Sequence, residues 1–66
     1  DMLNLEISNS LIGGTFSIVD YNGKKVLEGQ LISSVNRVNV NKLSKGQYYI
    51  LLQKGSDKIT RTFTLH

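Results

Sequence analysis

The sequence contains no cysteine and no proline, and each absence excludes something. Without cysteine there is no disulfide framework and no thiolate metal site, so the fold must be held by packing alone. Without proline, the exposed edges of a sheet need charges or bulges to protect them. The candidates for edge protection are Lys25, Lys54, Lys58 and Arg61.

Long apolar runs and a strong net charge are also missing. No apolar stretch approaches the ~18 residues of a membrane helix. The start, Asp1-Met2-Leu3, lacks the basic residues and the apolar run of a signal peptide. Because the chain begins with Asp1, we expect it to be excised from a larger secreted protein. The net charge of +3 is low for a nucleic-acid-binding domain.

Residue types that carry catalysis are scarce. The one histidine is His66, the last residue, and terminal residues are often frayed, so the serines have no base partner. The pair Gly13-Gly14 precedes a predicted strand rather than the helix that a phosphate loop requires. We therefore predict a protein that is not an enzyme, with no catalytic residue, no cofactor and no metal ligand. The carboxylates are scattered over predicted turns and strand edges: Asp1, Glu6, Asp20, Glu28 and Asp57.

The composition is that of one small folded domain covering residues 1–66. With 39% hydrophobic and 20% charged residues, the chain is too apolar to be a disordered tail. A domain of this size buries only about 60% of its unfolded surface, so we expect modest stability.

Apolar and polar residues alternate with a period of two along most of the chain, which predicts β-strands. No stretch shows the helical period of 3.6 over three turns, so no helix is predicted. Short strands with turn residues at near-regular spacing indicate an all-β antiparallel sandwich or small barrel. The predicted strands are residues 2–7, 15–20, 25–32, 36–40, 47–53 and 59–65.

The connections carry turn residues. Asn22-Gly23 predicts a hairpin with a type I′ turn, and Asp20 before it is interpreted as a turn residue. Gly29 interrupts the third strand and suggests a bulge or a bend. Residues 9–14 are predicted to form a loop and residues 54–58 a polar hairpin loop.

The stretch of residues 38–53 is predicted to form a strand, a tight turn and a second strand. Gly46 ends a turn and is expected to take a positive φ. The run of residues 48–52 is apolar on both faces, which is typical of a central strand. Its outward residues, Tyr49 and Leu51, form a candidate contact patch, or they are covered by a loop or by the strand of residues 25–32. Both interpretations stay open.

Basic residues and aromatic residues together raise the alternative of an oligonucleotide-binding barrel. The lysines fall mostly in predicted turns. Alternation places Phe16, Tyr48 and Phe63 on the inward face, where they could not stack on bases. Solvated turns are therefore favoured over nucleic-acid binding.

Three pieces of the chain resemble a known family in order and spacing. Residues 16–26 resemble its hairpin with the pattern D-x-x-G-K, and residues 38–48 resemble its core pattern L-x-x-G-x-Y. The closing stretch resembles its last strand. The family is the C-terminal sorting domain of the type IX secretion system (Por secretion system), type A. The candidate motif residues are Asp20, Gly23, Lys24, Leu43, Gly46, Tyr48, Lys58, Phe63 and Leu65.

The resemblance implies an immunoglobulin-like β-sandwich of about six to seven short strands at the C-terminal end of a cargo protein. Such a domain directs its cargo through the type IX outer-membrane translocon of a Gram-negative bacterium, with shuttle and sortase proteins as partners. A sortase-like protease then cleaves it, and the cargo can be linked to lipopolysaccharide. The implied location is the periplasm in transit, then the medium or the cell surface. Weak self-association is expected, and no nucleic acid.

Two other functions remain as alternatives to the sorting domain. The first is an accessory sandwich of a surface adhesin or carbohydrate-binding protein, for which Tyr21 and Tyr49 are the exposed aromatic candidates. The second is the nucleic-acid-binding barrel. For a sorting domain, we expect an exposed strand edge that pairs with a partner through its backbone.

Overall fold

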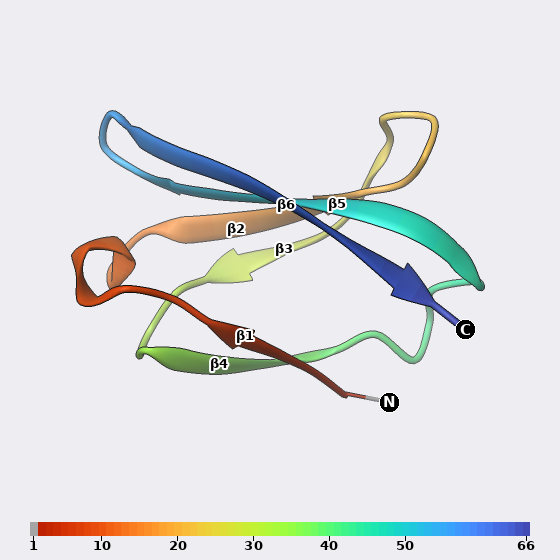
Figure 1. The fold of residues 1–66 in the computed structure, drawn as a ribbon, viewed down its shortest axis with the longest axis horizontal. Helices are drawn as coiled ribbons and strands as arrows, with labels where there is room; N and C mark the ends of the chain where they lie inside the picture. Colours follow the sequence, from red (N-terminus) through yellow and green to blue (C-terminus); the bar gives the residue numbers. More distant parts are fainter. Residues whose placement is uncertain (1) are drawn as a thin grey trace.

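The computed structural model describes residues 2–66, so the predicted Asp1 carboxylate lies outside the described residues. All strand pairs are antiparallel and form two sheets, one of two strands in the order β1-β4 and one of four in the order β3-β2-β5-β6 (Figure 1). The strands are β1 (Met2–Glu6), β2 (Thr15–Val19), β3 (Lys25–Gln30), β4 (Val35–Asn39), β5 (Gly46–Lys54) and β6 (Asp57–Leu65).

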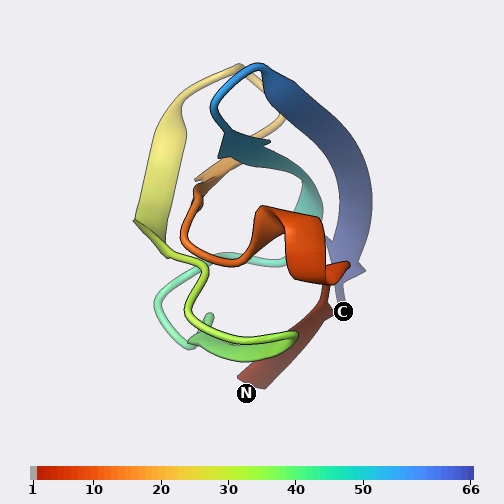
Figure 2. The same ribbon diagram turned by 90° about the vertical axis from the view of Figure 1, so that its left-hand side faces the viewer.

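The two sheets face each other across one apolar layer. Figure 2 looks along the strands and shows the two-stranded sheet below the four-stranded one, with the loop after β1 lying across the open end. The predicted all-β antiparallel sandwich is therefore confirmed, and the barrel alternative is wrong. Among residues 2–66, no helix has the length and apolar character needed to cross a bilayer.

The core follows the alternation seen in the sequence. Strand β5 shows this most clearly, because Tyr48, Ile50 and Leu52 are buried between the sheets while the residues between them are not. The other buried apolar residues are Leu5, Ile7, Leu11, Phe16, Ile18, Leu31, Val38 and Val40. β5 has a partner on each side, which confirms that it is a central strand.

One core residue comes from a stretch predicted to be a loop. The short 3₁₀ turn η1 (Asn9–Leu11) packs on β5 and places Leu11 in the core at 1% exposure. Below it, Gly13 N donates to Leu31 O (2.7 Å) and Leu31 N donates to Gly14 O (2.9 Å). These bonds hold the loop against the end of β3, so the predicted loop of residues 9–14 closes one end of the core.

Strand β3 departs from its prediction. It ends at Gln30, and its irregularity lies where Ile18 pairs with Leu27 but Val19 pairs with Lys25, which leaves Val26 as the extra residue. The bulge predicted at Gly29 is therefore wrong. Gly29 instead gives room to its cross-strand partner, because a Cβ there would lie 2.6 Å from the ring of Phe16.

A buried amide shapes the connection between β3 and β4. Asn36 is 7% exposed and faces the core beside the apolar residues of β4. Its Oδ1 accepts a hydrogen bond from Ile32 N (3.0 Å), and its Nδ2 donates one to Ser33 O (2.7 Å). Since an unpaired buried amide is costly, these bonds explain how a polar side chain is accommodated here.

The edges of the larger sheet are β3 and β6. Lys25 opens one edge strand and Lys58 and Arg61 lie on the other, as expected for residues that protect edges. The same prediction for Lys54 is wrong, because β5 is an interior strand. Lys54 Nζ instead donates to Ile12 O (2.7 Å), which ties the end of β5 to the loop after β1.

Candidate functional site

Most of the motif residues gather at one end of the four-stranded sheet. Val19 pairs with Tyr49 and Gly46 pairs with Leu65, so the turn after β2, the turn before β5 and the end of β6 lie at the same end. This end is on the right in Figure 1. Lys58 lies beside the β5–β6 turn at the opposite end. The structure thus brings together the first two motif pieces and the close of the third, and it separates Lys58 from them.

The turn after β2 is built around the Asp20 carboxylate. Asp20 Oδ1 accepts hydrogen bonds from Asn22 N and Lys24 N, each at 2.9 Å, which confirms Asp20 as a turn residue. Gly23 has φ +87°, but Asn22 does not have a positive φ. The predicted type I′ turn is therefore wrong, since that turn needs a positive φ at both central residues. The turn is instead stabilised by the hydrogen bonds from backbone N–H groups to the Asp20 carboxylate.

The L-x-x-G-x-Y pattern forms one local structure. Leu43 N donates to Val40 O (3.0 Å) in the turn, and Gly46 enters β5 with φ +148°, which confirms its predicted positive φ. The side chain of Tyr48 points back toward the turn, and its hydroxyl donates a hydrogen bond to Ser44 O (2.5 Å). A tyrosine hydroxyl that binds the backbone a few residues upstream also pins the corner between strands in immunoglobulin-like sandwiches.

The third motif piece packs on the second. Phe63 is the cross-strand partner of Tyr48, and their rings stack with centroids 5.4 Å apart and planes 20° apart. Leu65, half-buried, pairs with Gly46 at the end of the same ladder. These aromatic and apolar motif residues therefore join β6 to β5 and face the core.

We expect Tyr48→Phe to lower the free energy of unfolding by about 1–2 kcal/mol, because Ser44 O loses its partner while the ring packing stays. The matched control is Tyr49→Phe, one residue further on and on the outer face, which should change stability by less than about 0.5 kcal/mol. Urea unfolding followed by circular dichroism measures both. An equal loss in the two variants would contradict the role given to the Tyr48 hydroxyl.

Tyr49 and Leu51 lie on the outer face of the four-stranded sheet. Leu51 is 42% exposed and Tyr49 is half-buried against its partner Val19. The alternative that the strand of residues 25–32 covers them is wrong, because β3 belongs to the same sheet. Among the described residues no loop covers Leu51 either, as its exposure shows. Whether this face contacts a partner stays a prediction.

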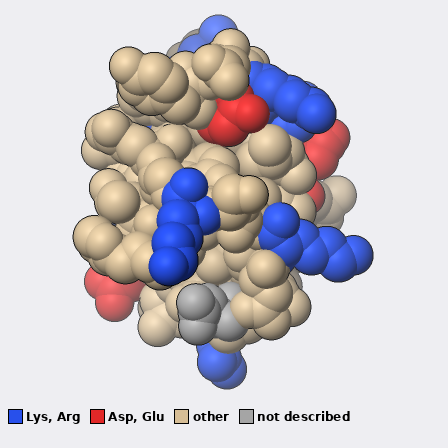
Figure 3. Space-filling model, turned by 90° about the vertical axis from the view of Figure 1, so that its right-hand side faces the viewer, with Lys and Arg blue, Asp and Glu red and all other residues tan. Residues whose placement is uncertain are grey.

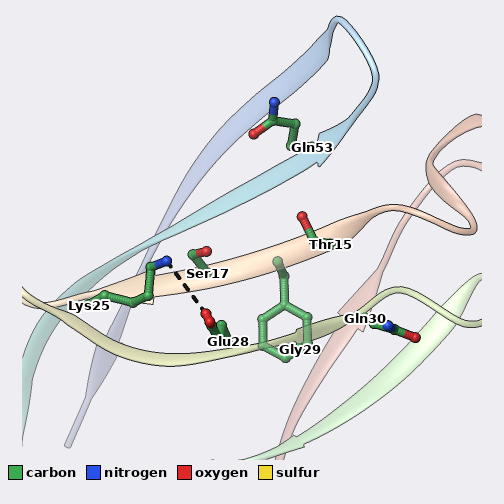
Figure 4. Close-up of a pocket in the computed structure, with 8 residues that line it drawn as sticks. Thr15, Ser17, Lys25, Glu28, Gly29, Gln30 and Gln53 are labelled. Carbon is green, nitrogen blue, oxygen red and sulfur yellow. Dashed lines mark hydrogen bonds and ion pairs between the residues drawn. The ribbon is translucent and has the colours of Figure 1, made fainter.

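A hollow of about 420 Å³, lined by polar side chains and by Phe16, opens beside this patch over the β2–β3 edge of the sheet (Figure 4). Lys25 Nζ and Glu28 Oε2 lie 3.5 Å apart across it (Figure 4). Ser17 pairs with Glu28 on β3 and with Leu51 on β5, so it lies between the ion pair and the patch. Its walls carry hydroxyl, amide and charged groups but no histidine and no buried carboxylate. Within residues 2–66 there is also no group of three or more His, Cys, Asp or Glu that could hold a metal ion.

Basic side chains occur at the end where the motif residues gather. Lys24, Lys42 and Lys45 are exposed in its turns. Figure 3 shows this end, where the basic groups stand apart from one another and acidic groups are also exposed. Phe16 and Tyr48 are buried, and Phe63 is partly buried against the core. Tyr21, 74% exposed in the turn after β2, is a single ring beside these charges rather than a row of rings for stacking. The arrangement does not favour the nucleic-acid alternative.

The last strand carries two features that the sequence interpretation did not reach. β6 runs for nine residues with regular pairing to β5, and its other side has no strand partner among residues 2–66. Arg61, on the inward row of β6, donates from Nη1 to Glu6 O (3.1 Å) at the end of β1. A lone charge in an alternating apolar row was visible in the sequence. Its partner, 55 residues away, was not.

The comparisons with known proteins agree with this geometry. The model of the family described as "Secretion system C-terminal sorting domain" matches residues 1–66. No curated protein and no solved structure was found to match the chain. The family match favours the sorting domain over the surface-module and nucleic-acid alternatives. The chain therefore belongs to the type IX secretion system C-terminal sorting domains, non-catalytic signal modules that interact with a secretion machinery and mark a protein for secretion or the cell surface.

Proposed function

We propose that residues 1–66 act as a single sorting domain of type A at the C-terminal end of a larger cargo protein. The domain directs that cargo from the periplasm through the type IX outer-membrane translocon. Shuttle and sortase proteins are its further partners, and a sortase-like protease removes it after export. The cargo is then released or held at the cell surface, where attachment to lipopolysaccharide is the expected anchor.

The observation that carries this proposal is the family match over residues 1–66. The structural roles of the motif residues support it. Asp20, Gly46 and Tyr48 shape turns, and Phe63 packs β6 on β5. These residues build a shape rather than a pocket. A signal of this kind is recognised from its folded surface, and the long free side of β6 is the feature best suited to backbone pairing.

A reporter export assay tests the proposal. The domain is fused behind a signal peptide and a reporter and expressed in cells that have the type IX apparatus. We expect the reporter in the medium or on the cell surface, and we expect a fusion lacking residues 61–66 to stay in the periplasm, because half of β6 is gone. Fractionation and reporter activity measure the distribution.

Two controls show whether export depends on the domain and on the type IX translocon. The double variant Lys42→Ser and Lys45→Ser changes exposed turn residues, which contribute little to stability, and should be exported normally. A strain lacking the translocon should retain every fusion. If the complete domain leaves the reporter inside cells that export a known cargo, the proposed function is wrong.

A further inference from the structure

The inner row of β6 is incompletely covered. In this row, which faces the same way as the core residues of β5, Ile59 is 39% exposed and Phe63 and Leu65 are half-buried. The apolar row is interrupted by Arg61, which is exposed and bound to a backbone carbonyl of β1. The outer row of β6 consists of Lys58 and three threonines.

The other strand edges are less suitable for an added strand. β3, the second edge of the larger sheet, is bulged at Val26 and carries the Lys25–Glu28 ion pair. β1 and β4 are five residues each. β6 is nine residues long with unbroken pairing and no proline or glycine within it. Bulges and short length are known protections of an edge, and β6 has neither, so its protection comes from the charges of Lys58 and Arg61.

Arg61 makes pairing of β6 with a second copy unfavourable. It is the central residue of the nine, so a full antiparallel pairing of two β6 strands would place Arg61 of one copy directly opposite Arg61 of the other. Like charges opposite each other on one face destabilise a strand pair. An inward-pointing charge on an edge strand has this effect on self-pairing in general.

We propose that the free edge of β6 is the docking site for an extended segment of the secretion machinery that carries a carboxylate opposite Arg61 and apolar residues two positions away on each side. The carboxylate replaces Glu6 O as the partner of Arg61, and the apolar residues cover Ile59 and Phe63. Backbone pairing gives affinity, while the acid opposite Arg61 gives selectivity over neutral or basic strands. The proposal rests on the proposed function, since it names the chemistry of the partner.

The test uses the 66-residue chain and a synthetic nine-residue peptide that alternates threonine and valine with glutamate at its centre. Amide chemical shifts in NMR locate the contact, and fluorescence anisotropy of the labelled peptide gives Kd. We expect shifts concentrated in β6 and weaker binding, by about tenfold or more, when lysine replaces the glutamate. Methylating alternate backbone nitrogens on the side that faces β6 should abolish binding.

A charge swap supplies the matched control. Arg61→Glu should prefer the lysine peptide over the glutamate peptide, whereas Arg37→Glu, the same change on β4, should keep the original preference. Far-UV circular dichroism checks that both variants are folded. The comparison of the glutamate and lysine peptides on the unchanged chain does not depend on any variant.

Equal affinity of the unchanged chain for the two peptides, shifts centred outside β6, or no binding of the glutamate peptide would each overturn the proposal. None of these results requires a cell. A failed docking site is thus distinguished from a failed sorting function, which the reporter assay tests separately.

Discussion

Ile50→Ala is expected to lower the free energy of unfolding by about 2–5 kcal/mol. Ile50 is 3% exposed in the central strand of the larger sheet, and its partner Ile18 is fully buried, so the removed atoms leave a cavity that the two sheets cannot close. A domain of this size has a total stability of roughly 3–10 kcal/mol. The variant should therefore be partly unfolded at room temperature, as measured by urea or thermal denaturation.

Leu51→Ala is the matched control for this variant. Leu51 is the next residue of the same strand, but it is 42% exposed on the open outer face. Its truncation should cost less than about 1 kcal/mol. Similar losses in the two variants would mean that the outer face is covered in solution, and the contact patch of Tyr49 and Leu51 would have to be abandoned.

Gly14→Ala is the second change expected to have a large effect. Gly14 is buried where the loop after β1 enters β2, and an added Cβ would lie 2.2 Å from the backbone oxygen of Gln53. A backbone atom of a central strand cannot move aside as a flexible side chain can. We expect a loss of about 3 kcal/mol or more in the same denaturation experiment.

Gly23→Ala separates a steric clash from a backbone preference. At Gly23 nothing lies within 4 Å of an added Cβ, but the residue has φ +87°. Alanine there should cost only about 1–2 kcal/mol, the usual penalty of a left-handed conformation. If Gly14→Ala were as mild as Gly23→Ala, the close approach between the loop and β5 would be wrong.

The strands were predictable from the sequence because local alternation and burial coincide. In β5, the apolar residues at every second position are the residues that the structure buries. Errors of one or two residues at the strand ends arise because backbone pairing, rather than side-chain pattern, decides where a strand stops. Strand β6, for example, begins at Asp57, two residues before its predicted start, since the β5–β6 ladder continues to the turn.

The wrong predictions concern residues whose role depends on a distant neighbour. The sequence suggests a bulge or a bend at Gly29, but the bulge lies at Val26 and the missing side chain of Gly29 makes room for Phe16 on the next strand. Lys54 was assigned to an edge because the strand order could not be read from the chain. Leu11 was placed in a loop, since a single 3₁₀ turn is too short to produce a helical period.

In the candidate site too, local motifs were predictable and long-range contacts were not. Leu43, Gly46 and Tyr48 were recognised as one motif, and the structure explains their spacing through the turn and the Tyr48–Ser44 hydrogen bond. The edge position of Lys58 and Arg61 was also expected, whereas the contact of Arg61 with the end of β1 required the three-dimensional arrangement.

The length of β6 has a mechanical consequence. Nine residues at about 3.3 Å each span roughly 30 Å, and the longest dimension of the molecule is 31 Å. A partner strand paired with all of β6 would contact the domain along its whole length. The domain could then not rotate relative to that partner, as it could about a single point of contact. The orientation of the domain in such a complex would then be set by a strand rather than by a hinge.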